Sequence, residues 1–547
     1  MLSSLKQHFN RRLLSTDASS PYFTYTSGRW LCNENAQMEL RRVVFNVAAL
    51  QRAAVAAVGA NSVTSMTKVG ENINRVFLLT FDNGKEAIAR LPTPIAGPPG
   101  LVTASEVATM DFLRRLRVPV PRILAWNSTS ETSDVGAEYI IMEKAEGREA
   151  TENDVDRSLV IGLAKALKPL ADLQFKYHGS IYYKKDVPAG EQSYGDFLLN
   201  PPSGVDFSPF VIGPIAQRDW WRDDRAKQKG GHGPWSSAYK YAFAVAHREQ
   251  LWLDTSAKPY VYDHYLCGLP GQGKIDDHIE ILNSYKDLLP YIMPDEPSMA
   301  SGRLWHPDLH QGNIFLRDTN TVEVASLIDW QGACVGPAFL QLSVPEIIYS
   351  NDAPTCMKSS PPLLLDGLND EDRVDAERRS KAAALHKEFE RLAYPELLSL
   401  PLRRTCYRLH EMAGYTWQTG ALMFRYSLLS LHDRWDELEL EPGSCPISFT
   451  PSDRDFLDKA FVSYVKCNQL AVDMDKEFGL GECGHFVYKG DPVKDAEEFR
   501  RIKEILEERR KEHMQYAPKH EHGQRVRALL WPYRDTLDDH PRTHLLL

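Results

Sequence analysis

Two hydrophobic periodicities organise the chain between residues 45 and 146. Residues 45–58 carry apolar side chains at helical spacing, and Gly59 follows them, as is typical just after a helix. The next apolar runs alternate with polar positions at the two-residue period of strands. The turn over residues 82–84, Asp-Asn-Gly, lies between two of these runs and predicts a hairpin. We therefore expect a small antiparallel sheet with strands near residues 67–70, 75–81, 87–91 and 138–142.

A glycine-bearing polar turn, residues 70–74, lies near the start of this predicted sheet. Backbone amides in a turn of this kind can cover phosphate groups, and Gly70 and Asn74 are the candidate contacts. Such turns occur in many proteins, so an ordinary hairpin turn is the alternative.

A basic and an acidic residue follow at positions that suit phosphate binding. Arg90 closes the third predicted strand, and Glu106 lies in the next predicted helix. In a kinase-like lobe, a cation at the first position contacts phosphates and is held by a helix carboxylate at the second. The alternative for Glu106 is a helix-capping role, because Thr103 stands three residues before it.

The segment 143–147 follows the last predicted strand and has the character of a hinge. Exposed backbone at Glu143 and Ala145 could hydrogen-bond the edge of an adenine, with Met142 behind it. An ordinary turn between domains is the alternative.

The most informative stretch is residues 304–330, LWHPDLHQGNIFLRDTNTVEVASLIDW. It predicts a loop, a short strand over 313–316, a polar turn over 318–321, and a second strand that ends at Asp329. This arrangement places three polar residues around the two ends of one hairpin, where their side chains can converge. They are Asp308, Asn313 and Asp329.

Those three residue types are the ones that phosphoryl transfer requires. Asn313 and Asp329 offer the oxygen ligands that Mg²⁺ prefers, together with the phosphates of ATP. Asp308 can accept or orient the proton of an attacking hydroxyl, and its spacing from Asn313 is the D-x-x-x-x-N spacing of kinase catalytic loops.

At these residues the chain resembles the aminoglycoside/choline-type phosphotransferase family, whose catalytic loop reads H-x-D-L-H-x-x-N before an I-D-W or I-D-F motif. All fixed loop positions are present: His306, Asp308, Leu309, His310 and Asn313. The resemblance implies that His306 and His310 belong to the catalytic loop, shaping it around Asp308, and that ATP and Mg²⁺ are bound. The family's strand lysine is Arg90 here, and arginine can also bind phosphate.

The small lobe is closer still to a fungal mitochondrial group of that family. The phrases that carry this similarity are AIARLPTPIAGPP, SEVATMDFLRR, VPVPRILAW and GAEYIIMEKAEG. The resemblance implies an α+β, protein-kinase-like two-lobed fold. Its small antiparallel-sheet lobe spans 36–146, and its large, mostly helical lobe spans 147–547, with an insertion at about 180–300 and a helical C-terminal region.

The first residues have the pattern of a targeting sequence. Lys6, Arg11 and Arg12 precede the first acidic residue, Asp17, and apolar residues recur at helical spacing. This pattern is typical of a mitochondrial transit peptide, so residues 1–35 are expected to be a leader, and the matrix is the expected compartment. A merely polar N-terminus is the alternative.

Overall composition excludes several classes of protein. A net charge of -10 argues against general nucleic-acid binding. None of the eight cysteines forms a C-x-x-C pair, and no apolar run reaches the 18 or so residues of a membrane-spanning helix. The pair His306 and His310 does not match a helical zinc motif, because Pro307 disfavours the helix which that motif needs.

Together these features predict a phosphotransferase that moves a phosphoryl group from ATP to a hydroxyl of a small molecule. The alternative is a nucleotide-binding pseudokinase or scaffold that supports mitochondrial maintenance or inheritance through protein partners. The aromatic-rich range 180–300 is expected either to pack irregular structure or to contribute to an acceptor pocket. Neither the acceptor, nor the protein partners, nor the oligomeric state follows from the sequence.

Overall fold

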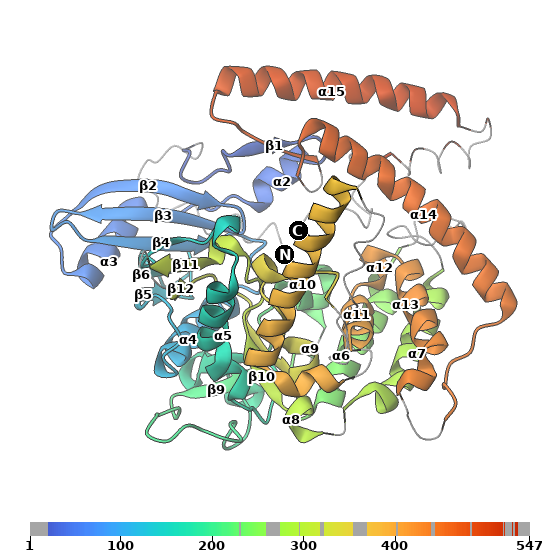
Figure 1. Cartoon of the computed structure of the whole chain (residues 1–547). Coiled ribbons are helices and arrows are strands. Elements are labelled where there is room, and N and C mark those ends of the chain that lie inside the picture. Colours follow the sequence, from blue (N-terminus) through green and yellow to red (C-terminus); the bar gives the residue numbers. More distant parts are fainter. Residues whose placement is uncertain are drawn as a thin grey trace.

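The computed structural model describes residues 20–228, 231–258, 274–294, 296–317, 322–353, 369–400, 403–438, 443–481, 484–517, 519, 524, 528 and 531–533. The expected α+β architecture of a sheet-containing small lobe and a mostly helical large lobe is confirmed (Figure 1). The predicted leader residues 1–19 and the polar turn 318–321 lie outside the described residues.

The small lobe is built on a five-stranded antiparallel sheet in the order β2-β3-β4-β6-β5. Alternate residues of β3 and β4, among them Phe77, Leu79 and Ala89, are fully buried on one face of the sheet. That face packs against α3 through Leu50 and Ala54. The elements of this lobe are β2 (Val63–Glu71), β3 (Asn74–Phe81), β4 (Glu86–Pro92), β5 (Ile123–Asn127), β6 (Tyr139–Glu143), α3 (Val47–Val58) and α4 (Leu101–Arg115).

Local signals place the ends of these elements. The side chain of Asn46 accepts a hydrogen bond from Ala49 N at the start of α3, and Gly59 ends the helix with a φ of 69°. The hairpin predicted at residues 82–84 joins β3 to β4, as expected.

A strand near the start of the described chain pairs with a strand from its C-terminal part beside the small lobe. Strand β1 (Gly28–Trp30) pairs antiparallel with β14 (His485–Val487), and helix α2 (Glu34–Leu40) follows β1. Phe23 and Trp30 are buried, at 0% and 4% exposure. We call residues 20–42 together with β14 the terminal strap. Part of the range expected to be leader is therefore folded structure.

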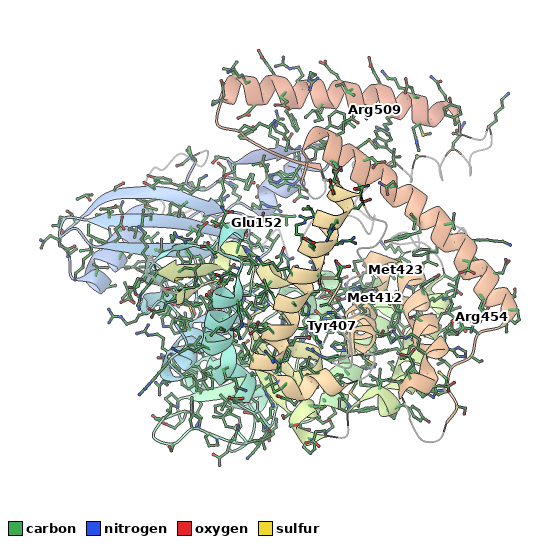
Figure 2. All side chains as sticks on the ribbon, viewed as in Figure 1. Glu152, Tyr407, Met412, Met423, Arg454 and Arg509 are labelled. Carbon is green, nitrogen blue, oxygen red and sulfur yellow. The ribbon has the colours of Figure 1, made fainter. Side chains whose placement is uncertain are left out.

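Two long helices arch over the molecule beside the terminal strap (Figure 1). They are α14 (Pro451–Phe478) and α15 (Pro492–Gln515). Arg509 of α15, labelled in Figure 2, holds Glu477 of α14 in a two-bond ion pair with both N–O distances at 2.7 Å. Phe499, Ile502 and Leu506 form the buried stripe of α15, which docks a highly charged helix through a narrow apolar face.

The large lobe has one continuous core that includes the range 180–300. Ile181, Phe210, Trp220 and Leu282 from this range pack with Leu304 beside the catalytic loop. The helices of the lobe are α5 (Arg157–Asp172), α6 (Ala238–Ser256), α7 (Ile275–Ile292), α8 (Pro297–Ala300), α9 (Ala338–Gln341), α10 (Asp370–Ala393), α11 (Arg403–Ala413), α12 (Thr416–Thr419) and α13 (Ala421–Asp433). Its strands are β7 (Arg148–Glu149), β8 (Ser180–Tyr183), β9 (Phe210–Gly213), β10 (Gly302–Trp305), β11 (Ile314–Arg317), β12 (Glu323–Leu327) and β13 (Cys334–Pro337).

Short 3₁₀ turns complete the described connections. They are η2 (Glu152–Asp154), η3 (Lys184–Asp186), η4 (Ala189–Glu191), η5 (Arg218–Trp220), η6 (Asp223–Lys227), η8 (Gln311–Asn313), η9 (Glu346–Ile348), η10 (Pro395–Ser399) and η11 (Trp435–Leu438). Among the described helices, none combines the length and apolar character that crossing a bilayer requires.

Candidate active site

One hairpin brings the polar residues of the 304–330 motif together. Ile314 of β11 pairs with Leu327 of β12, so Asn313, just before β11, and Asp329, just after β12, lie at the same end. The N–H of Ile328 donates to the backbone carbonyl of Asn313 at 3.1 Å, which joins the two loops directly.

His306 fixes the loop before Asn313 through two hydrogen bonds. Its Nε2–H donates to the carbonyl of Ile328 at 2.8 Å, and its Nδ1 accepts the N–H of Asp308 at 3.1 Å. The residue is 3% exposed and lies edge-on to Trp330 at 4.5 Å between ring centroids. Burial lowers the pKa of His306 to about 4, so the ring is neutral at pH 7. These contacts fix the backbone on both sides of the site, at Asp308 and at Ile328.

Asn313 and His310 complete the loop. The Asn313 Nδ2 donates to the carbonyl of Asp308 at 2.8 Å, which leaves the amide oxygen as the atom available to a cation. His310 Nδ1 accepts the N–H of Gly312 at 3.1 Å and caps η8. The Asp308 side chain is exposed beside these contacts. A hydroxyl can therefore approach it.

Asp329 adopts a left-handed backbone conformation with a φ of 62°, which is uncommon for a residue other than glycine and costs about 1 kcal/mol. Its side chain is 45% exposed, so the carboxylate remains open to a ligand.

Arg90 connects the loop that carries Asp329 with the small lobe. Its Nη1 lies 2.8 Å from Asp329 Oδ1, and its Nη2 forms an ion pair with Glu106. Arg90 and Glu106 are 8% and 1% exposed, so this pair is almost fully desolvated. Desolvation lowers the pKa of Arg90, and the charge of Asp329 opposes that shift. The ion pair expected between Arg90 and Glu106 is thus formed, and Arg90 reaches Asp329 as well, while its contact with phosphate stays a prediction.

The capping alternative for Glu106 is wrong. Helix α4 begins at Leu101 with Gly100 as its N-cap, so Thr103 and Glu106 both lie inside the helix. The Thr103 hydroxyl instead donates to Glu138 Oε2 at 2.6 Å.

The turn of residues 70–74 is tighter than a mobile loop. Gly70 belongs to β2 and pairs with Val76, so only Asn72 and Ile73 lie between the strands. An added Cβ at Gly70 would approach Val76 Cγ2 to 3.1 Å, which explains the glycine by packing.

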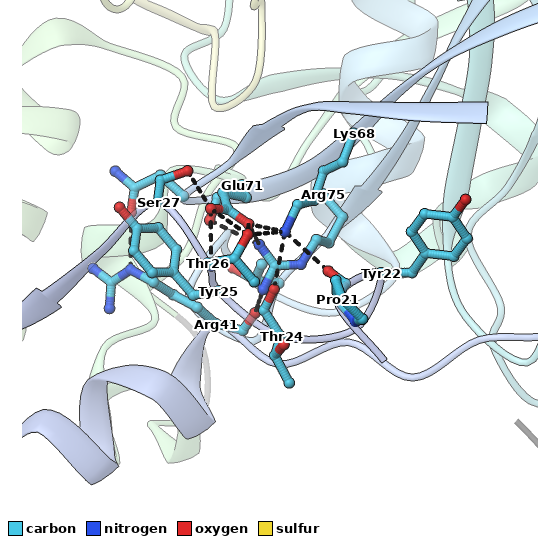
Figure 3. Close-up of polar contacts among 12 residues, drawn as sticks. Pro21, Tyr22, Thr24, Tyr25, Thr26, Ser27, Arg41, Lys68, Glu71 and Arg75 are labelled. Carbon is cyan, nitrogen blue, oxygen red and sulfur yellow. Dashed lines mark hydrogen bonds and ion pairs between the residues drawn. The ribbon is translucent and has the colours of Figure 1, made fainter. Parts of the chain in front are cut away.

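The terminal strap anchors this turn through Glu71 (Figure 3). The carboxylate of Glu71 accepts the Thr26 N–H at 2.9 Å and the Ser27 hydroxyl, and it forms an ion pair with Lys68. Arg75 is fully buried and donates to the backbone carbonyls of Glu71 and Arg41. Nothing local in the sequence marks this cluster, because its contacts between the strap and the sheet join residues 34 to 45 positions apart.

A reciprocal amide pair joins the two lobes next to Asp329. Asn74 Nδ2 donates to Gln331 Oε1 at 3.0 Å, and Gln331 Nε2 donates to Asn74 Oδ1 at 3.2 Å. The side chain of Asn74 thus contacts the loop that carries Asp329, and the predicted phosphate contact of the turn concerns its backbone amides. Gln331 was missed, although a polar residue directly after I-D-W was the available signal.

The hinge residues lie where the small sheet ends. Strand β6 ends at Glu143, whose N–H donates to Arg122 O at 2.9 Å and whose carboxylate pairs with Arg122 Nε at 3.0 Å. The Glu146 N–H donates to Ser326 Oγ at 3.2 Å. Ala145 lies between these anchored residues, beside a cavity of about 330 Å³ lined by Glu143 and Glu146.

The donor set suits a hard cation better than a transition metal. Among the described residues there is no group of three or more His, Cys, Asp or Glu side chains that could hold a metal ion. Asn313 and Asp329 offer one amide oxygen and one carboxylate, which is the sparse oxygen set that Mg²⁺ accepts when phosphates complete its coordination.

Comparison with known proteins agrees with this arrangement. Residues 66–343 match the model of the phosphotransferase enzyme family. A subtelomeric hrmA-associated cluster protein of Aspergillus fumigatus is 30% identical over 428 residues, 70% of this chain and 81% of that protein. The mitochondrial protein altered inheritance of mitochondria protein 9 of Yarrowia lipolytica is 25% identical over 349 residues, 58% of this chain and 59% of that protein. The similarity expected to a fungal mitochondrial group is thus confirmed.

Solved structures show a more distant likeness. Macrolide 2′-phosphotransferase of Brachybacterium faecium is 13% identical, with a TM-score of 0.31 over 76% of this chain and 98% of that chain. Aminoglycoside phosphotransferase of Alicyclobacillus acidocaldarius is also 13% identical, with a TM-score of 0.28 over 77% of this chain and 95% of that chain.

Proposed function

Because this chain belongs to the phosphotransferase enzyme family, we propose that it transfers the γ-phosphoryl group of ATP to a hydroxyl of a small molecule. The observation that carries the proposal is the joining of Asp308, Asn313 and Asp329 through one hairpin end. The two lobes meet there through Arg90.

Each residue has a role that its contacts support. Asp308 accepts the proton of the acceptor hydroxyl as the new oxygen–phosphorus bond forms and the bond to ADP breaks. Asn313 and Asp329 would hold Mg²⁺, which when bound neutralises charge on the phosphate oxygens. Arg90, fixed by Glu106, supplies a second cation for the phosphates.

The nucleotide would lie between the hinge and the β2–β3 turn. In this proposal the backbone at Glu143 and Ala145 holds the adenine edge, and the turn from Gly70 to Asn74 covers the phosphates. The strap contacts of Glu71 support the second assignment, since they fix the position of the turn.

The protein is proposed to act in mitochondria, in the matrix. The pattern of its first 17 residues and its similarity to relatives named as mitochondrial support this location. Phe23 and Trp30 are buried, so a leader that is removed should end before the terminal strap.

Thermal unfolding with ATP, in the presence and absence of Mg²⁺, tests the proposal. We expect Mg²⁺-dependent stabilisation in the wild type and its loss in Asp329→Asn. Asp308→Asn is the matched variant, because it should keep the stabilisation and lose acceptor-dependent ATP consumption. ATP that binds without Mg²⁺ dependence, or turnover that survives Asp308→Asn, would contradict the assignment.

A nucleotide-binding scaffold is the second candidate, and the ion pair between Arg90 and Asp329 favours it. That pair occupies one carboxylate oxygen of the proposed metal ligand. A scaffold predicts stabilisation by nucleotide with no phosphoryl transfer to any of a broad set of alcohols, and with no effect of Asp308→Asn.

A further inference from the structure

A cavity of about 290 Å³ adjoins the catalytic loop on the side of the large lobe. His306 and Pro307, directly before Asp308, form one wall. Other walls come from Asp219 and Trp220 of η5, from α6, and from α11 with the labelled Tyr407 (Figure 2). The volume lies at the lower end of small-molecule sites, which span about 300–1,000 Å³. It therefore suits a ligand of metabolite size.

Arg248 of α6 is a buried cation in this cavity that forms no ion pair among the described residues. The residue is 5% exposed, and its Nη1 and Nη2 donate to the carbonyls of Asp219 and Gly414 at 3.2 and 3.1 Å. Its Nε has no hydrogen-bond partner, and its guanidinium lies 4.3 Å from the ring centroid of Trp220. In the described part of the chain, no carboxylate comes within 4.0 Å of its nitrogens.

Arg225 of η6 is a buried arginine in the same lobe whose charge is compensated by an ion pair. It is 1% exposed and forms an ion pair with Glu249, whose other oxygen accepts the N–H of Trp417 at 3.1 Å. A buried cation without a carboxylate in contact is costly. The charges of Glu249 and Asp219 act on Arg248 without forming an ion pair, so its Nε remains available to a ligand carboxylate.

Glu411 is the complementary feature of the same cavity. Asp219 is already paired with Arg222 Nη2 at 2.9 Å, whereas Glu411 has no cationic partner within 4.0 Å among the described residues. Glu411 is an exposed residue, and partial desolvation of its carboxylate raises its pKa, a rise that Arg408 opposes and nearby Asp219 reinforces. Tyr241, Tyr407 and Tyr415 also line the cavity, and aromatic faces attract ammonium groups.

We propose that this cavity binds the phosphoryl acceptor as a zwitterionic alcohol of the hydroxy amino acid class. Arg248 binds its carboxylate, and Glu411, with the tyrosine rings, binds its ammonium. The assignment rests on the proposed function, because it presents the remaining hydroxyl to Asp308.

The two charges exclude the simpler classes of acceptor. An amino alcohol without an acid would add a second cation beside Arg248 and leave its Nε unmet. A hydroxy acid without an amine would bring a third anion to a cavity that already holds Asp219 and Glu411. A zwitterion satisfies both groups at once.

Matched alcohols test the class. L-serine is compared with ethanolamine and 3-hydroxypropanoate, and L-homoserine with 3-aminopropanol and 4-hydroxybutanoate. Binding is measured by calorimetry in the presence of Mg²⁺ and a non-hydrolysable ATP analogue, so that no turnover is needed. We expect at least one zwitterion to bind about tenfold or more tightly than both of its singly charged partners. Equal binding by a singly charged partner, or binding by neither zwitterion, overturns the proposal.

Variants test which charged group of the ligand each residue binds. Arg248→Gln should weaken the zwitterion about tenfold or more and leave the matched amino alcohol unaffected, and Arg248→Lys should restore part of the loss. Glu411→Gln should also weaken binding of the zwitterion, but it should leave binding of the matched hydroxy acid unaffected. Lys240→Gln, an exposed residue of α6 outside the cavity lining, is the matched control. Uniform losses for all probes would identify a structural role for these residues and overturn the assignment.

The outcome is separable from that of the proposed function. Asp308→Asn should abolish phosphoryl transfer while zwitterion binding persists. A protein that binds a zwitterion and never transfers phosphate refutes the enzyme and keeps the site. A protein that phosphorylates only amino alcohols keeps the enzyme and refutes the site.

Discussion

Arg90 Nη1 lies 2.8 Å from Asp329 Oδ1, so a small-lobe strand and the proposed metal-site loop are joined by one ion pair. The same guanidinium pairs with Glu106, which is 1% exposed. Arginine can form this bridge because its forked donors reach two carboxylates, whereas a lysine ammonium is a single point charge. Arg90 and a bound Mg²⁺ would therefore compete for the Asp329 carboxylate.

Arg90→Met should destabilise the protein by about 3 kcal/mol, because it leaves the buried Glu106 carboxylate without a counter-charge. Urea unfolding measures the change. The matched control is Arg122→Met, whose ion pair with Glu143 is exposed and should contribute less than about 1 kcal/mol. Equal losses of unfolding free energy in the two variants would show that the buried ion pair contributes no more to stability than the exposed one.

Arg90→Lys tests the bridge without removing the charge. We expect the ammonium to keep the ion pair with Glu106 and release Asp329, so the Mg²⁺ concentration for half-maximal stabilisation by ATP should fall several-fold. Titration of Mg²⁺ in thermal unfolding measures this value. A rise in the required Mg²⁺ concentration would show that Arg90 assists the metal site and does not compete with it.

Removal of residues 1–19 should leave stability unchanged, whereas removal of residues 1–32 should prevent stable folding. The longer deletion exposes the partners of Phe23, Tyr25 and Trp30, which are 0%, 7% and 4% exposed. Burial of each such side chain contributes about 1.5–3 kcal/mol, and a typical domain has only about 5–15 kcal/mol in total. Circular dichroism of the two truncated proteins decides the matter, and equal melting temperatures would refute a structural role for the terminal strap.

The amide pair of Asn74 and Gln331 should couple the lobes. A double-mutant cycle with Asn74→Ala and Gln331→Ala is expected to give a coupling free energy of about 0.5–1.5 kcal/mol, because each change leaves a partly buried amide unsatisfied. Lys144 and Glu86, an exposed pair at 52% and 38%, provide the control cycle. A coupling no larger than that of the control would mean that the lobes are held by other contacts.

Stability should fall as the solution is acidified from pH 6.5, and His178 contributes to that fall. Burial lowers the pKa of His178 to about 3, below the ordinary value of 6.5. The unfolded chain therefore binds a proton between pH 6.5 and 3 that the folded chain does not, so stability falls as pH decreases through this window. The expected slope for one group is about 1.4 kcal/mol per pH unit. His178→Phe should reduce the slope of unfolding free energy against pH by that amount, and an unchanged slope would exclude His178.

Much of the small lobe could be predicted because its signals are local. Asn46 and Gly59 mark the ends of α3, and residues 82–84 form the expected hairpin turn. The D-x-x-x-x-N spacing between Asp308 and Asn313 depends on one short loop, so the sequence carries it directly.

Long-range pairing required the tertiary structure. In the linear sequence Thr103 explains Glu106 equally well as a capping partner. In the structure α4 begins at Leu101, with Gly100 as its N-cap, and Glu106 pairs with Arg90. The carboxylate of Glu71 accepts hydrogen bonds from Thr26 and Ser27, which are more than 40 residues away in the sequence. Such contacts depend on how separate elements pack, and a linear pattern does not contain that information.

The residue order alone therefore decided the class of chemistry, because a hard cation and a proton acceptor need particular side chains at short fixed spacing. Tertiary packing alone decided which charges are compensated. It gave Arg90 two carboxylates and left Arg248 with none among the described residues, since the free energy of a buried charge depends on neighbours that only folding brings near.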